Sequence, residues 1–141
     1  MTKDVIVTIE GLQLGEENDR IITKANGLYQ LQKGNHYIRY EEMIDGVEGA
    51  TKNLIKVTPD LVKITKKGAA STTMTFRLNE VTSTSYQTPY GNLMLQIQTS
   101  QMQVKEDTDS LNINLSYTIM ANGDLLSKNR TKITIQSQET K

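Results

Sequence analysis

Cysteine is absent from this 141-residue chain, and histidine occurs once, at His36. The absence of thiols excludes disulfides, thiolate catalysis and cysteine-based zinc sites. One histidine is too few for a zinc or copper site that is built from protein ligands alone. We therefore expect no metal and no cofactor.

An excess of either charge is also missing, because 16 lysine and arginine residues balance 16 aspartate and glutamate residues. Nucleic-acid-binding proteins usually carry a basic surface, since phosphate contacts supply much of their affinity. Anionic membrane surfaces attract basic segments for the same electrostatic reason. The balance of charge argues against a nucleic acid or a membrane as a partner.

Long apolar runs are absent as well. No segment approaches the roughly 18–20 apolar residues of a membrane-spanning helix. The opening residues, MTKDVIVTIEG, lack the basic and then apolar order of a signal peptide. The sequence thus predicts a cytoplasmic protein, with residues 1–141 forming one domain that is large enough to bury a core without disulfides.

What the chain does have is apolar residues at every second position. The pattern runs unbroken through Leu111–Ile119 and recurs in Leu93–Ile97 and Met74–Leu78. Threonine occurs 18 times and alanine five times, a bias that favours strands over helices. Because successive side chains of a strand point to opposite faces, the pattern predicts sheets with one buried face.

Turn signals divide the chain into eight or nine expected strands. We expect a glycine bulge at Asn26-Gly27 inside one long strand, with a tight hairpin turn there as the alternative. We also expect a second bulge near Ser100 and a connection over the Thr- and Ser-rich stretch Asn79–Gly91. The expected strands are Asp4–Leu14, Arg20–Gln32, His36–Ile44, Lys52–Val57, Leu61–Lys67, Ser71–Leu78, Asn92–Lys105, Leu111–Ala121 and Leu125–Gln138.

Sequential strands joined by short turns predict an all-β fold with up-and-down antiparallel topology. A row of eight or nine strands either leaves two exposed edges or closes on itself, and closure removes the edges. We therefore expect a closed barrel, with a two-sheet sandwich as the alternative. A barrel of about eight strands can hold one small ligand.

The last hairpin has a predictable register. A two-residue turn at Asn122-Gly123 would place the apolar residues of its two strands on opposite faces. A three-residue loop, Asn122–Asp124, pairs Tyr117 with Asn129 and keeps the apolar residues on one face. We therefore expect the longer loop, with Tyr117 and Asn129 pointing inward near one end of the barrel.

Three segments carry a resemblance to a known family. They are His36–Glu42 (HYIRYEE), Thr88–Leu93 (TPYGNL), and Leu115–Tyr117 followed by Asn122-Gly123 and Asn129. In order and spacing they resemble the YwiB-like family of small bacterial proteins, over nearly the whole chain. The resemblance implies a calycin-type, lipocalin-like β-barrel from Gram-positive bacteria, and it implies no activity because that family has no known function.

An inward carboxylate is the first candidate site. Ile38, Tyr40 and Glu42 share one face of their strand, and a buried carboxylate needs a partner. Tyr40, Tyr117 and Asn129 are candidate partners. The functional interpretation is a polar group that orients a ligand, and the structural interpretation is a buried network that fixes the register.

Tyr86 and Tyr90 are the second candidate site. They flank Pro89 and would form a lid or a stacking rim at the barrel mouth, or else a structural turn. We expect His36 to be exposed at a strand end, and Lys66 and Lys67 to lie on the surface. No residue is nominated as catalytic, because nothing in the sequence supplies a nucleophile for His36.

Three classes of function remain. The first is a non-enzymatic cytoplasmic barrel that binds a small-molecule ligand, with candidate residues Tyr40, Glu42, Tyr86, Tyr90, Tyr117 and Asn129. The alternative is a protein-interaction module with a filled barrel core, as a monomer or a homodimer. An enzyme that uses interior Tyr and Glu groups is the third class and has the least support. Because fold alone does not imply function, the first class rests on the analogy with calycins.

Overall fold

The computed structural model of the chain describes residues 2–14, 19–43, 49–68, 71–88 and 91–138. These residues form ten strands and a closed barrel in which each strand pairs with its neighbours in sequence. The strands are β1 (Thr2–Leu14), β2 (Asp19–Gln32), β3 (Asn35–Met43), β4 (Ala50–Val57), β5 (Val62–Lys67), β6 (Ser71–Phe76), β7 (Val81–Thr88), β8 (Gly91–Glu106), β9 (Ser110–Ala121) and β10 (Asp124–Ser137).

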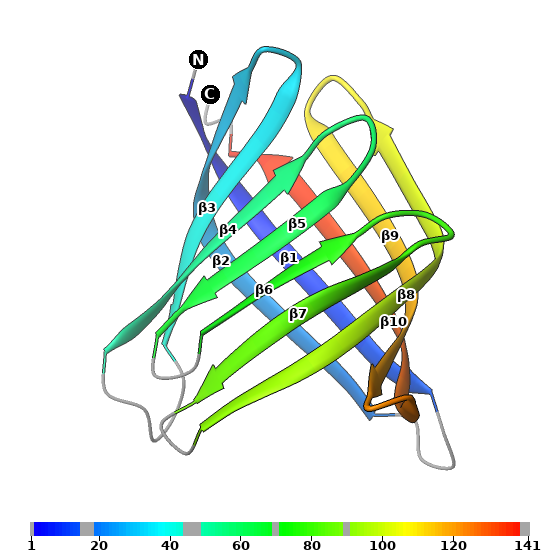
Figure 1. The fold of residues 1–141 in the computed structure, drawn as a ribbon. Coiled ribbons are helices and arrows are strands. Elements are labelled where there is room, and N and C mark those ends of the chain that lie inside the picture. Colours follow the sequence, from blue (N-terminus) through cyan, green and yellow to red (C-terminus); the bar gives the residue numbers. More distant parts are fainter. Residues whose placement is uncertain (1, 15–18, 44–48, 69–70, 89–90, 139–141) are drawn as a thin grey trace.

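The barrel closes where β1 pairs with β10 in an antiparallel ladder, from Val5 opposite Ser137 to Leu14 opposite Lys128. Figure 1 shows this seam, with the start of β1 beside the end of β10. The all-β, up-and-down barrel of lipocalin type is confirmed, with ten strands in place of the expected eight or nine. The two-sheet sandwich is excluded by the closed strand order.

The additional strand is β7, and it lies in the Thr- and Ser-rich stretch that we expected to be a connection. Its Thr82 and Thr84 hydroxyls donate hydrogen bonds to the backbone carbonyls of Thr75 and Thr73 on β6. Threonine is β-branched and suits a strand, but it gives no alternation of apolar and polar residues. The prediction was wrong here because it relied on that alternation.

The β9–β10 hairpin has the expected register, but its turn differs from the expected three-residue loop. Tyr117 lies opposite Asn129, as predicted, yet the turn is the two-residue one, because Ala121 pairs with Asp124. Asn122 and Gly123 both have positive φ, which a tight hairpin turn requires. A bulge between Leu125 and Ser127 supplies the extra residue that we had assigned to the loop.

The two other predicted bulges have different outcomes. β8 shifts register between Thr99 and Gln101, which confirms the bulge near Ser100. β2 is one long strand, as expected, but its register against β1 runs without a shift through Asn26 and Gly27. The bulge predicted there was wrong.

The core fills one end of the barrel, where the odd-numbered strands begin and the even-numbered strands end; we call this the closed end, and the opposite end the open end. Ile38, Ile113 and Ile133 are fully buried there beside Phe76, whose ring packs edge-on against Tyr117 at 4.8 Å between centroids. None of the described residues belongs to a helix that is long and apolar enough to span a membrane.

Candidate ligand-binding site

β2 and β3 stop pairing with each other near the middle of the barrel. They pair only from Gly27 opposite Tyr40 to Gln32 opposite Asn35. Beyond that point Asp19–Asn26 continues beside β1, and Glu41–Met43 continues beside β4, as Figure 1 shows. The wall of the barrel is therefore split toward the open end.

Gly27 stands where the two strands separate. A Cβ atom at this position would lie 2.8 Å from the carbonyl oxygen of Arg39 and 3.0 Å from the Cγ2 atom of Val7. Only glycine allows so close an approach of β3 to β2 without a shift of the backbone. Farther along β2 the inward positions are also held by small residues, Ala25 and Thr23, which leave space behind the split.

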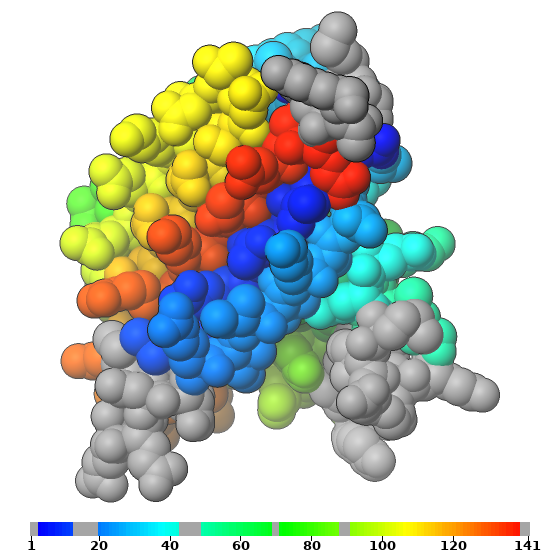
Figure 2. Space-filling model, turned by 180° about the vertical axis from the view of Figure 1, so that it is seen from behind, coloured from blue at the N-terminus to red at the C-terminus, as the bar shows by residue number. Residues whose placement is uncertain are grey.

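That space is part of a cavity of about 1120 Å³ that spans the split and continues onto the outer face, where Leu54 and Thr65 line it. Its wall includes Ala25 on β2, Tyr40 and Glu42 on β3, and Asn53 on β4, with charged side chains such as Lys24 and Arg39 at its outer rim. In Figure 2 the blue β2 and the cyan β3 diverge toward the lower part of the view, and green atoms from farther along the chain are visible between them. The cavity thus opens sideways through the split wall.

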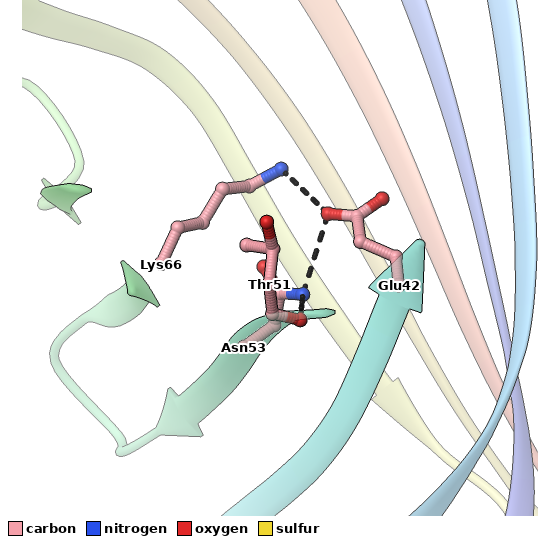
Figure 3. A network of polar contacts seen from close by, with 4 residues as sticks. All are labelled: Glu42, Thr51, Asn53 and Lys66. Carbon is pink, nitrogen blue, oxygen red and sulfur yellow. Dashed lines mark hydrogen bonds and ion pairs between the residues drawn. The ribbon is translucent and has the colours of Figure 1, made fainter. Parts of the chain in front are cut away.

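A polar network holds the deepest carboxylate of this cavity (Figure 3). Glu42 Oε1 accepts hydrogen bonds from Asn53 Nδ2 and from Lys66 Nζ, both at 3.3 Å, and the second contact is also an ion pair. Asn53 Nδ2 also donates to the backbone carbonyl of Thr51 at 3.2 Å. Glu42 is therefore an inward carboxylate with a charged and a neutral partner, which compensates for its partial desolvation.

Two polar atoms on the cavity wall are buried without a hydrogen-bond partner: the Tyr40 hydroxyl and Asn53 Oδ1. Tyr40 is only 4% exposed and Asn53 only 3%. Burial, together with the nearby Glu42 carboxylate, holds the pKa of Tyr40 far above its usual value, so this phenol stays protonated. Buried polar atoms are usually paired, and these two are exceptions that belong to cavity-lining residues but have no accessible surface of their own.

The structure brings together only part of the predicted site. Tyr40 and Glu42 line the cavity, whereas Tyr86, Tyr117 and Asn129 are not among its lining residues. Tyr117 shares a hydrogen bond with Thr131, and Asn129 donates to Ser127, so neither is a described partner of Glu42. Tyr86 lies on β7 opposite Leu93, in a strand and not in the expected loop, and Tyr90 lies outside the described residues.

Two residues of the network were not predicted, although the sequence holds a signal for both. Lys66 follows Val62 and Ile64 at two-residue spacing, and Asn53 precedes Ile55 and Val57 at the same spacing. Lys66 lies directly opposite Asn53, and its side chain, 41% exposed in agreement with the expected surface position, also contacts Glu42. Lys67, the next residue, is exposed as expected.

His36 is buried at the closed end, which corrects the expectation of an exposed strand end. It is 8% exposed, and its Nδ1 atom lies 2.6 Å from the Tyr29 hydroxyl. Its Nε2 atom lies 3.3 Å from Glu106 Oε1. His36 is in phase with Ile38 on the inner face, and its partners come from β2 and β8. In the described part of the chain no group of three or more His, Asp or Glu residues is placed to hold a metal ion.

The buried tyrosines predict a loss of stability at alkaline pH. Burial raises the pKa of Tyr40 and of Tyr117, and for Tyr117 the hydrogen bond to Thr131 offsets part of this. Unfolded tyrosine loses its proton near pH ~10. Because the folded pKa values are higher, stability is intact below about pH 10 and falls above it, by about 1.4 kcal/mol per pH unit for each such group.

Urea unfolding at about pH 8 and about pH 11 tests this expectation. The Tyr40→Phe variant should lose less free energy of unfolding between the two pH values than the wild type. Tyr37→Phe, on the outer face of the same strand, is the matched control and should behave like the wild type. Equal losses for the wild type and Tyr40→Phe would contradict the buried, protonated state of Tyr40.

Comparisons with known proteins give a family and a fold. A family model described as "Domain of unknown function (DUF1934)" matches residues 7–133. Among solved structures, the crystal structure of ywiB protein from Bacillus subtilis is similar to this chain, with a TM-score of 0.86 at 19% sequence identity, over 98% of this chain and 94% of that one. At this identity the likeness shows the fold alone. A comparison with curated proteins finds no match.

Proposed function

We propose a function from the cavity itself, because this chain belongs to the family "Domain of unknown function (DUF1934)", whose description assigns no activity. The resemblance to the YwiB-like family is confirmed by that match and by the structural likeness to ywiB. The proposed function is non-enzymatic binding of one small molecule in the cavity between β2 and β3. We keep the cytoplasm as the expected location.

The cavity and its Glu42 carboxylate, which accepts hydrogen bonds from Asn53 and Lys66, carry this proposal. The cavity, at about 1120 Å³, has room for a small molecule, and its outer part is open to solvent. Small residues on β2 leave this space open beside a rim of long charged side chains.

The same residues support a catalytic function less well than they support ligand binding. The Tyr40 phenol is held in its protonated form, and the Glu42 carboxylate already accepts hydrogen bonds from Asn53 and Lys66. Neither group is therefore placed as a free general base. Binding without chemistry is the simpler proposal.

A protein-interaction module remains the alternative, and one observation favours it. Ile21, Ile22, Met94 and Leu125 are more than half exposed. They lie near the starts of the even-numbered strands β2, β8 and β10, which share the open end. The closed end has the filled core that this alternative expected. A concentration-dependent homodimer that Ile22→Lys disrupts would favour the alternative.

Filling the cavity should abolish binding and leave the fold intact. Ala25 faces inward on β2 and lines the cavity, so Ala25→Leu places a larger side chain where the ligand would lie. We expect a panel of small polar molecules to shift backbone amide NMR signals of Ala25, Tyr40 and Asn53 in the wild type. The variant should show affinity at least about tenfold weaker, the effect of roughly 1.4 kcal/mol.

Gln96→Leu is the control for that variant, because Gln96 is exposed on the outer face of β8. It places a leucine side chain away from the cavity and should bind like the wild type. Signal shifts clustered at the closed end, or equal affinity in Ala25→Leu and the wild type, would contradict the proposed site.

A further inference from the structure

The split in the barrel wall leaves two strand edges without a partner strand, and the inference drawn from them rests on the proposed function. Among the described residues, β2 pairs with β3 only from Gly27 onward, and β3 pairs with β2 only as far as Tyr40. Residues 20–26 therefore pair with β1 alone, and residues 41–43 pair with β4 alone. Alternate residues of both segments direct their backbone N–H and C=O groups into the split, where no described strand meets them.

The cavity lies between these two edges. Residues 22–26 of β2 line it, as do Glu41 and Glu42 of β3, and Figure 2 shows the two strands diverging toward the open end. An unpaired edge binds an extended peptide by adding it to the sheet as a further strand. Seven residues of a strand span about 23 Å, so residues 20–26 can pair with a short peptide. Gly27 and Tyr40, where pairing resumes, limit its length at one end.

The outer side of the split is basic. Glu42 is already paired with Lys66, and the other acidic residues of the cavity lining are Asp4 and Glu41. They are outnumbered by four exposed cations from four successive strands, and none of these cations forms an ion pair with a described residue. The four are Lys24 on β2, Arg39 on β3, Lys52 on β4 and Lys67 on β5. Carboxylates are the ligand groups that this rim would attract.

The inner side of the split favours small, uncharged side chains. Thr23 and Ala25 are the inward residues of the unpaired β2 edge, and both are small. Across the cavity the Glu42 carboxylate has Lys66 as its counter-ion. A charged group of either sign would therefore lie near an ion of its own sign. Because side chains of a strand alternate between two faces, one bound strand can meet both requirements.

We propose that the ligand is a short acidic peptide, bound in extended conformation as a further strand between β2 and β3. Its backbone pairs with the two free edges, its inward side chains are small and uncharged, and its outward side chains are carboxylates that meet the basic rim. Lys52 lies directly opposite Lys67, and a carboxylate that meets this pair offsets the repulsion between the two ammonium groups. A second copy of the chain would bring the same cations into the split, so charge favours the acidic peptide over self-association.

Three hexapeptides test the inference. Glu and Thr alternate in the first, Lys and Thr alternate in the second, and the third is the first with N-methyl groups on its backbone amides, which keeps the charge but removes the backbone donors. Each is titrated into the wild type while amide NMR signals are recorded. The first should shift the signals of residues 20–26 and 41–43, slow hydrogen exchange there, and bind at least about tenfold more tightly than the other two.

Lys67→Glu and Lys63→Glu are a matched pair of variants for the basic rim. Both lysines are exposed on the outer face of β5, but only Lys67 lines the cavity. Lys63 lies about 13 Å farther along the strand, beyond the roughly 8–10 Å over which exposed charges interact at physiological salt. Lys67→Glu should weaken binding of the Glu-Thr peptide at least about fivefold, and Lys63→Glu by less than about twofold.

The outcomes separate the inference from the proposed function. If the panel of small molecules shifts the cavity signals and the Glu-Thr peptide does not, the peptide ligand is wrong and ligand binding stands. The inference is also overturned if the N-methylated or the lysine peptide binds as tightly as the Glu-Thr peptide, or if the two lysine variants bind it equally well. If no peptide and no small molecule of the panel shifts the cavity signals, both proposals fail.

Discussion

Phe76→Ala should produce the largest loss of stability of any substitution discussed for this protein. Phe76 is 1% exposed and lies opposite Val62, with its ring against the edge of Tyr117. Removing a buried phenylalanine ring costs about 3–5 kcal/mol, because the transfer free energy is lost and a cavity remains. Against a typical total of about 5–15 kcal/mol, this is a large share of the free energy of unfolding.

Urea unfolding measures this loss, with Leu78→Ala as the control two residues farther on. Leu78 is largely exposed, so its truncation should change the free energy of unfolding by less than about 1 kcal/mol. Phe76→Ala should also leave Tyr117 without its aromatic neighbour. A loss below about 1 kcal/mol for Phe76→Ala would show that the closed end is not the tightly packed core described above.

Gly27→Ala should produce the second large effect, by a different mechanism. The new Cβ atom would lie 2.8 Å from the Arg39 carbonyl oxygen, so β3 must move away from β2 at the last pair that joins them. Overpacking of this kind costs about 1–3 kcal/mol. We expect this destabilisation together with faster amide hydrogen exchange in Leu28–Gln32, because the β2–β3 ladder is short.

Gly11→Ala is the matched control on the neighbouring strand. A Cβ atom at Gly11 would meet no heavy atom within 4 Å. Its substitution should leave stability unchanged or raise it by about 0.4–1 kcal/mol, through the entropy of the unfolded chain. If the two glycine variants were equally stable, the close approach at Gly27 would not be what positions the split between β2 and β3.

Apolar alternation in the sequence was enough to predict the barrel, because a buried face imposes that pattern on every strand it includes. Apolar alternation did not predict β7, because Thr82 and Thr84 stabilise that strand through hydrogen bonds from their hydroxyls to backbone carbonyls. These hydrogen bonds leave no apolar pattern in the sequence. The β9–β10 register was predictable because the buried face decides it. The length of the turn was not predictable, since a two-residue turn with a bulge at Leu126 and a longer loop give the same register.

The candidate site was predictable only along single strands. Two-residue spacing placed Tyr40 and Glu42 on the inner face, and it could have placed Asn53 and Lys66 there as well. What joins these four residues is the register across β3, β4 and β5 and the separation of β2 from β3 at Gly27. Both are properties of strand pairing, which no single segment of the sequence encodes.

Native mass spectrometry of the wild-type protein, purified gently from a bacterial host, tests the central claim most directly. The claim is that the cavity behind the split wall holds a small molecule. We predict a reproducible additional mass of a small molecule that is lost on denaturation and absent from Ala25→Leu. A wild-type protein that shows only its own mass, identical in bound composition to Ala25→Leu, would contradict the account.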